Sequence, residues 1–257
     1  MFLPPLNLKI LAVVFAGGFL PSLLWLWFWL HEDRKNPEPK TMILATFIAG
    51  GLSVFLAFYL EKQASVSLDM SSLENAKIHF SPFWQGLKAS YPLIALFFGW
   101  ALIEEFVKYL AAVVVAFRNK NFDEPVDAMI YMVTAALGFA AVENSLFLIK
   151  TIRLGLGGFE FLLNGNMRFF GATLLHIFSS AIIGAVVGLS FQITGWRKVV
   201  RIVIGVLVAS LLHALFNFFI IINDGQNTFK VMVVLWLLTV TVIILFEKIK
   251  KIKLSYV

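Results

Sequence analysis

Residues 91–117 read YPLIALFFGWALIEEFVKYLAAVVVAF, an apolar stretch that contains two adjacent carboxylates and, shortly after them, an ammonium. The stretch exceeds the roughly 20 residues with which a helix crosses about 30 Å of hydrocarbon. An ionisable side chain near the middle of such a helix costs about 2.5–3.5 kcal/mol on insertion scales, so Glu104, Glu105 and Lys108 require a purpose. We interpret the segment as a membrane-spanning helix that contributes either a reaction centre or a path for ions, protons or substrate.

The composition of the whole chain also indicates a membrane protein. Hydrophobic residues make up 60% of the 257 residues and charged residues only 14%, whereas about 25% of a soluble domain is charged. The net charge of +6 could suggest nucleic acid, but the basic residues stand singly between apolar stretches and in the tail KIKKIKLSYV. Membrane topology requires this pattern, and we expect no nucleic-acid partner. Because cysteine is absent, disulfides and thiolate metal sites are excluded.

Seven apolar stretches are long enough to span the bilayer. They cover residues 8–30, 41–60, 91–117, 127–150, 168–192, 199–222 and 229–247. The expected fold is therefore all-α, a polytopic membrane bundle of about seven transmembrane helices. We expect one transmembrane domain over residues 1–257, with its polar core near residues 91–222.

The distribution of basic residues predicts the orientation of the chain. With the N-terminus outside, twelve of the 21 Lys and Arg residues lie in cytoplasmic connections and eight in external ones. Positive residues favour the cytoplasmic side. We therefore expect a multi-pass protein of the cell membrane with an external N-terminus and a cytoplasmic C-terminus. The longest connection, residues 61–90, would then be external.

Four of the predicted helices carry an ionisable residue at similar depth. Counted at about 1.5 Å per residue from the external ends, Glu104 lies about 20 Å deep, His213 about 13 Å, His176 about 12 Å and Glu143 about 10 Å. Helices can bury such groups against one another, which lipid cannot do. The sequence therefore predicts one polar site in the outer half of the membrane. Gly138 and neighbouring alanines would let another helix approach closely.

The spacing within each helix adds detail to this site. Glu104 and Lys108 are four residues apart and share a helix face, whereas Glu105 points about 100° away. We therefore expect Lys108 to pair with Glu104 and the two carboxylates to have different roles. In HALFN, His213 and Asn217 lie one turn apart on a common face.

Each polar group also has a purely structural interpretation. The two glutamates and the lysine of residues 104–108 could form a salt bridge that holds helices together. Glu143 and the adjacent Asn144 could be an interhelical hydrogen-bond pair, and His176 or the pair of His213 and Asn217 could simply be hydrogen-bonded packing residues. Two carboxylates with one ammonium leave an excess of negative charge, however, which favours a functional site over a salt bridge.

These motifs, in this order, resemble the PrsW family of intramembrane proteases. They are an EExxK motif at residues 104–108, FDEPVDAMIY at 122–131, GFAAVEN at 138–144, an intramembrane histidine at 176 and HALFN at 213–217. The segment HEDRKNPEPK at 31–40 is similar to the acidic, proline-containing segment of that family. The resemblance covers about residues 20–220. The family is related to CAAX-prenyl endopeptidases and to bacteriocin-processing and self-immunity proteins.

The resemblance implies hydrolysis of a peptide bond within or next to the membrane. The substrate would be a membrane-anchored protein, such as an anti-sigma factor, and the lipid bilayer would be the other partner. Glu104 and Glu105 match the glutamate pair of the superfamily, His176 matches its first histidine, and His213 with Asn217 matches its final HxxxN. The lysine at 108 stands four residues after the first glutamate, where the superfamily has an arginine after five.

Amide hydrolysis needs an activated water, a group that stabilises the oxyanion and a proton donor for the leaving amine. We expect Glu104, or else Glu105, to activate the water together with His176. His213 and Asn217 would then polarise the scissile carbonyl oxygen. In this interpretation Lys108, Glu143 and Asn144 support the site, and neither a metal nor another cofactor is required.

Two alternatives stay open at this point. A zinc ion could be held by His176 and His213 with Glu104 or Glu143, although the chain has no HExxH motif. Buried Glu, His and Lys residues could instead form a proton-coupled transport path, or bind lipid or peptide without catalysis. An immunity or scaffold protein of the same fold that has lost its activity belongs to this second group.

Overall fold

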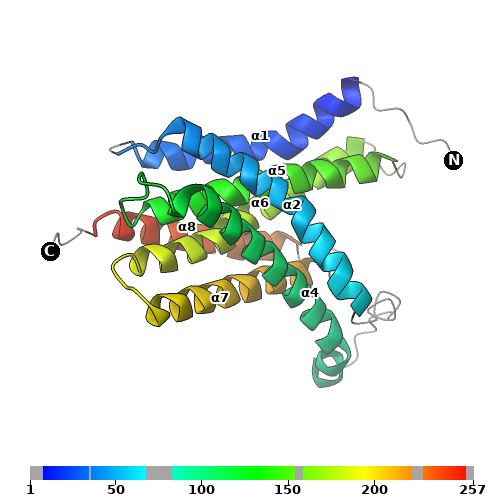
Figure 1. Ribbon diagram of the computed structural model, residues 1–257. Coiled ribbons are helices and arrows are strands. Elements are labelled where there is room, and N and C mark those ends of the chain that lie inside the picture. The colour runs from blue at the N-terminus through cyan, green and yellow to red at the C-terminus, as the bar shows by residue number, and fades with distance from the viewer. Residues whose placement is uncertain (1–7, 35, 68–82, 154–158, 222–227, 253–257) are drawn as a thin grey trace.

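The computed structural model describes residues 8–34, 36–67, 83–153, 159–221 and 228–252. All regular structure within these residues is helical, which confirms the all-α prediction. The elements are α1 (Leu8–Glu32), α2 (Lys40–Ser67), α4 (Phe83–Ala112), η1 (Val113–Phe117, a π-helical turn), α5 (Asp127–Arg153), α6 (Phe159–Leu189), α7 (Trp196–Ile221) and α8 (Thr228–Ile249). Figure 1 shows their arrangement.

Six of the helices have the length and apolar composition of membrane spans: α1, α2, α5, α6, α7 and α8. The part of α4 from Tyr91 to Ala112 is also apolar except for Glu104, Glu105 and Lys108. The chain is therefore a multi-pass membrane protein, as its composition predicts.

Three helices extend well beyond their apolar stretches. The helix α6 begins at Phe159, before the predicted start at residue 168. The helix α2 continues to Ser67 and α4 begins at Phe83, so both enter the predicted 61–90 connection. The apolar stretch marks only the part that hydrocarbon can cover, whereas residues 61–64, EKQA, favour a helix and prolong it. As a consequence, Glu61 belongs to a helix and not to a loop.

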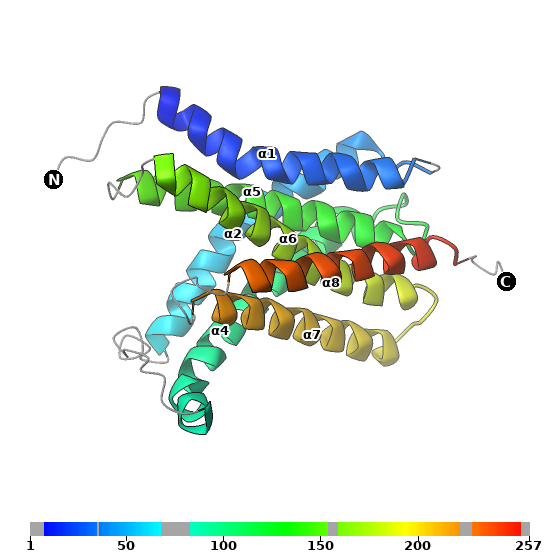
Figure 2. The ribbon, with the colours of Figure 1, turned by 180° about the vertical axis from the view of Figure 1, so that it is seen from behind.

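The helix α5 lies at the centre of the bundle and packs against α1, α2 and α6. Residues 127–141 of α5 are buried all around the helix. In both views α1, α5, α8 and α7 run alongside one another, whereas α2 and α4 cross them obliquely (Figures 1 and 2). The end of α2 and the beginning of α4 reach furthest from the other helices.

Glycine allows α2 and α5 to touch through their backbones. A Cβ atom added to Gly138 of α5 would lie 1.9 Å from the carbonyl oxygen of Phe47 in α2, and one added to Gly50 would lie 2.0 Å from that of Ala135. Both distances are far below van der Waals contact. The close approach that the small residues predict is therefore present at this pair of helices.

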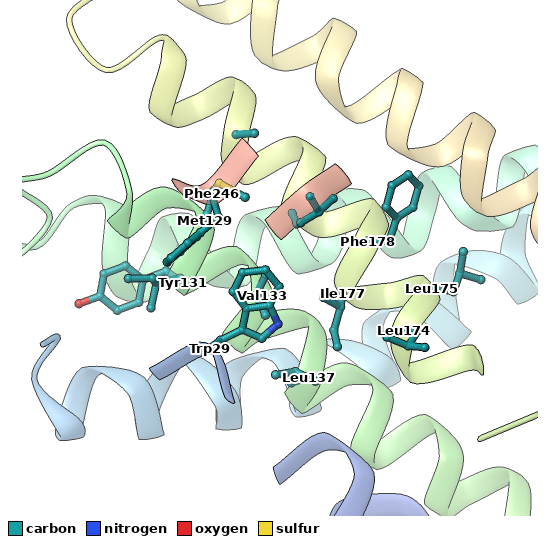
Figure 3. Close-up of a cluster of buried hydrophobic side chains, with 14 of the residues drawn as sticks. Trp29, Met129, Tyr131, Val133, Leu137, Leu174, Leu175, Ile177, Phe178 and Phe246 are labelled. Atoms are coloured by element: carbon teal, nitrogen blue, oxygen red, sulfur yellow. The ribbon is translucent and has the colours of Figure 1, made fainter. Parts of the chain in front are cut away.

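The largest apolar core joins α1, α5, α6 and α8 (Figure 3). Trp29 of α1 packs edge-on against Phe246 of α8, with ring centroids 5.2 Å apart. Side chains of α5, including Met129 and Leu137, and of α6, including Ile177, complete this core. The core fixes α6 relative to α5, and both helices carry site residues further along.

A polar network closes the end of the bundle at which α5 begins. Asp127 accepts hydrogen bonds from the backbone N–H groups of Asp123 (2.9 Å) and Glu124 (2.7 Å), which holds the DEPVD loop in a turn. The Glu124 carboxylate accepts a bond from Asn36 (2.7 Å) in the α1–α2 connection. This end lies about 24 Å along α5 from Glu143, at about 1.5 Å per residue.

Candidate active site

The polar residues predicted from four helices meet in one place. The helix α4 contributes Glu104, Glu105 and Lys108; α5 contributes Glu143 and Asn144; α6 contributes His176; and α7 contributes His213 and Asn217. They form a hydrogen-bonded cluster and the lining of an adjoining cavity, so helices far apart in sequence share one polar site.

Glu105 is the fully buried centre of the cluster, with no exposed side-chain surface. It accepts hydrogen bonds from Lys108 Nζ, Ser179 Oγ and Ser180 Oγ, each at 2.8 Å. Its Oε1 also lies 2.9 Å from Nδ1 of His213. These donors come from α4, α6 and α7. A carboxylate that is so fully bonded is held in one position and joins the three helices.

Ser179 and Ser180 are site residues that the sequence analysis did not identify. They follow His176 by three and four residues and therefore share its face of α6. This spacing is the only signal in the sequence, and small polar residues at such positions are also common at ordinary helix contacts.

Glu104 has a different environment from its neighbour. Its side chain is 12% exposed, and its Oε2 lies 3.9 Å from His176 Nδ1 and 3.7 Å from His213 Nε2. The Lys108 ammonium is 3.5 Å from Glu104 but 2.8 Å from Glu105. The pairing of Lys108 with Glu104, which the spacing predicts, is therefore the weaker of two contacts. Positions i+3 and i+4 both lie near the same face, so long side chains can converge on either carboxylate.

The contacts of His176 assign its tautomer. Its Nδ1 lies 2.7 Å from Lys108 Nζ, and its Nε2 lies 2.8 Å from Glu143 Oε2. An ammonium can only donate, so Nδ1 accepts the bond from Lys108. The ring proton is then on Nε2 and is donated to Glu143, which makes Glu143 the residue that orients His176.

His213 is oriented by Glu105 in a similar way. Because the carboxylate of Glu105 can only accept, Nδ1 of His213 carries a proton and donates it. The other ring nitrogen, Nε2, faces Glu104. The His176 and His213 rings contact each other edge to face, with centroids 5.1 Å apart.

A cavity of about 280 Å³ opens beside this cluster. It is lined by six of the predicted site residues: Glu104, Glu143, Asn144, His176, His213 and Asn217. Glu105 and Lys108 lie behind this lining. Asn144 also donates a hydrogen bond of 3.2 Å to Thr173 of α6, so it forms the interhelical contact that its structural interpretation predicts.

Glu61 lines the cavity from α2 and is a further residue that the sequence analysis missed. The apolar stretch of α2 ends just before it, and a single acidic residue at such an end normally belongs to the solvated boundary. Only the oblique path of α2 brings it to the cavity. Aromatic side chains complete this wall, among them Phe58, Phe97 and Trp100.

Three residues of the site are close enough together to hold a metal ion. One ligand atom each from Glu104, His176 and His213 can be chosen so that all three lie within 4.8 Å of one another. Two nitrogen ligands and one carboxylate are a common set in catalytic zinc sites. Glu143 and Glu105 hold the opposite nitrogens of the two rings, as carboxylates do behind metal-binding histidines. The residues therefore fit a metal ion. To bind it, His176 Nδ1 would have to give up its hydrogen bond from Lys108.

Comparisons with known proteins agree with the motifs. A family model described as "PrsW family intramembrane metalloprotease" matches residues 38–245. The chain is 26% identical over 230 residues to Protease PrsW of Oceanobacillus iheyensis, covering 88% of this chain and 92% of that protein. It is 23% identical over 209 residues to Protease PrsW of Bacillus subtilis, covering 80% and 81%. No solved structure gives a significant match.

The family match spans most of the chain and includes every helix that contributes to the cavity. The chain belongs to the PrsW family of intramembrane proteases.

Proposed function

We propose that this protein hydrolyses a peptide bond of a membrane-anchored protein with a water molecule that Glu104 activates. The position of Glu104 supports this most directly. Its carboxylate borders the cavity and lies within 4 Å of both histidines, whereas Glu105 is enclosed by its partners. A carboxylate that borders a cavity can contact a substrate. An enclosed carboxylate can only hold neighbouring side chains in position.

The reaction needs one proton to move twice. Glu104 takes a proton from water as the water oxygen bonds to the scissile carbonyl carbon. The carbon–nitrogen bond then breaks, and the same proton passes from Glu104 to the leaving nitrogen. This balances amide hydrolysis without a further reactant.

His213 and Asn217 would stabilise the oxyanion that forms on the carbonyl oxygen. Both side chains line the cavity from α7, one turn apart. In this proposal His213 acts as an imidazolium that donates from Nε2 as well as from Nδ1, with Glu104 and Glu105 beside the two nitrogens. With Lys108, this imidazolium would balance the charges of Glu104 and Glu105.

A metal-dependent hydrolysis is the second candidate. It is supported by the close grouping of Glu104, His176 and His213 and by the description of the matching family as a metalloprotease. These three residues would hold the ion, which would polarise the carbonyl group and make a water molecule more acidic. Glu143 and Glu105 would then orient the two rings. The family match favours either form of proteolysis over transport or binding alone.

We further propose that the substrate is a single-pass protein, such as an anti-sigma factor, and that it is cut towards the external side. The cavity lies where α2, α5 and α7 approach their C-terminal ends, and this is the end of the bundle that the count of basic residues places outside. The proposed orientation has an external N-terminus and a cytoplasmic C-terminus in the cell membrane.

Co-expression with a panel of epitope-tagged single-pass proteins tests this proposal. Wild type should release a substrate fragment that Glu104→Gln and His213→Ala do not release at equal expression. The same fragment in all three strains would mean that another protease produces it. Glu247→Gln, which removes an exposed carboxylate of α8, is the control for a change of charge alone.

A further inference from the structure

Two side chains in the cavity wall carry a buried polar atom that has no partner among the described residues. They are Glu61, through Oε1, and Trp100, through Nε1. A buried polar group without a hydrogen bond costs about 1–3 kcal/mol, so an unpaired atom in a native protein needs an explanation. Because both side chains border a cavity, a group that enters the cavity can supply the missing contact once the side chain rotates its polar atom towards it.

Acidic side chains are prominent in the described lining of the cavity. Three carboxylates line it, those of Glu61, Glu104 and Glu143. The buried ammonium of Lys108 lies behind the lining and is engaged by Glu105 and His176. A cation that enters the cavity could pair with the ionised form of the three carboxylates, and such pairing is strong in a region of low dielectric constant.

The wall around Glu61 is aromatic. Phe58 precedes Glu61 by three residues on the same face of α2, and Phe97 and Trp100 line the cavity from α4. The rings of Phe97 and Trp100 meet edge to face, with centroids 6.0 Å apart. Aromatic faces attract ammonium and guanidinium groups, most strongly where water is excluded. A carboxylate among aromatic rings is thus suited to a basic side chain.

We propose that Glu61 determines specificity by binding a lysine or arginine side chain of the substrate close to the scissile bond. This inference rests on the proposed proteolysis and adds a feature of the substrate to it. Glu61 lies near the end of the apolar α2 span at Ser65, and the end of a span is where a membrane boundary is expected. Basic side chains of single-pass proteins extend to that boundary, so their position matches the position of Glu61.

The cleavage test uses one processed single-pass substrate whose cut site has been mapped by mass spectrometry. Each residue within four positions of the cut is replaced in turn by Lys, Gln or Glu. Wild type should cleave the Lys form about tenfold better than the Glu form at one of these positions, mainly through a lower KM. Glu61→Gln should remove this difference and Glu61→Lys should reverse it. Glu247→Gln, at the far end of α8, should keep the wild-type order.

A binding test separates this inference from the proposed reaction. This test uses synthetic single-pass peptides that carry a photoreactive group and have Lys, Gln or Glu at the position found in the cleavage test. If no cleavage is found, the substituted position is the residue at the membrane boundary. The peptides are added to Glu104→Gln protein. The Lys peptide should label the protein most strongly. In the double variant Glu104→Gln, Glu61→Gln, the three peptides should label the protein equally. Equal labelling by the protein that retains Glu61 overturns the inference. Absence of cleavage by wild type, with selective labelling intact, overturns the proposed reaction alone.

Discussion

Oε1 of Glu105 lies 2.9 Å from Nδ1 of His213, although 108 residues separate the two in sequence. The bond ties α7 to α4 and leaves Nε2 of the histidine facing Glu104. One carboxylate of the EE pair therefore orients a histidine, while the other borders the cavity.

Substitution of Glu105 should damage the fold, in contrast to substitution of Glu104. Glu105→Gln would leave the Lys108 ammonium and two serine hydroxyls without their charged acceptor. Breaking a buried ion pair in this way costs about 3–5 kcal/mol. Thermal unfolding in detergent should show a much lower Tm for Glu105→Gln than for Glu104→Gln. Equal Tm values would contradict the division of roles between the two carboxylates.

Ser180→Ala should lower stability and activity together. Its hydroxyl donates to Oε2 of Glu105, and loss of that bond leaves a buried oxygen less satisfied, at a cost of about 1–3 kcal/mol. Ser210→Ala is the matched control, because that buried hydroxyl donates only to the carbonyl oxygen of Val206 in its own helix. Ser180→Ala should unfold at a lower temperature and cleave substrate more slowly than Ser210→Ala. Equal stability and equal cleavage rates of the two variants would mean that Ser180 does not contribute to the site.

Gly138→Ala should force α2 and α5 apart. The added Cβ would lie 1.9 Å from the Phe47 carbonyl oxygen, and backbone cannot yield as a side chain can. Gly99→Ala is the control, since its Cβ would meet no atom within 4 Å and alanine favours a helix. Size-exclusion profiles should show loss of folded Gly138→Ala protein only. Normal behaviour of that variant would mean that the α2–α5 contact is looser than described.

Much of the fold follows from sequence because membrane physics is restrictive. A span needs a minimum apolar length, and a charged group inside it needs a partner, so both the helices and the set of polar positions are predictable. The boundaries of α2 and α4 were less predictable, because helix propensity continues where the apolar signal stops.

The details of the site depend on contacts between helices, which spacing within one helix does not determine. Lys108 lies closer to Glu105 than to Glu104, and Ser180 and His213 from two other helices bind the same Glu105 carboxylate. Glu61 reaches the cavity only through the path of α2. The catalytic roles of Glu104, His176, His213 and Asn217, and the absence of a metal, remain predictions.

Metal removal tests the two proposed forms of hydrolysis against each other. In the metal-free form, cleavage should persist in EDTA and 1,10-phenanthroline, and purified protein should contain less than one zinc per chain. Lys108→Met should then increase zinc binding by the folded protein, because a methionine side chain cannot donate to His176 Nδ1. Stoichiometric zinc that His213→Ala abolishes would instead establish the metal-dependent form.

The rate of cleavage by purified Glu104→Gln protein in liposomes, relative to wild type, tests the central claim most directly. With both proteins equally folded and supplied with the same single-pass substrate, the account predicts a loss of at least about 10³-fold, because the substitution removes the group that accepts the proton of the water. Cleavage by Glu104→Gln within a few-fold of the wild-type rate would contradict it.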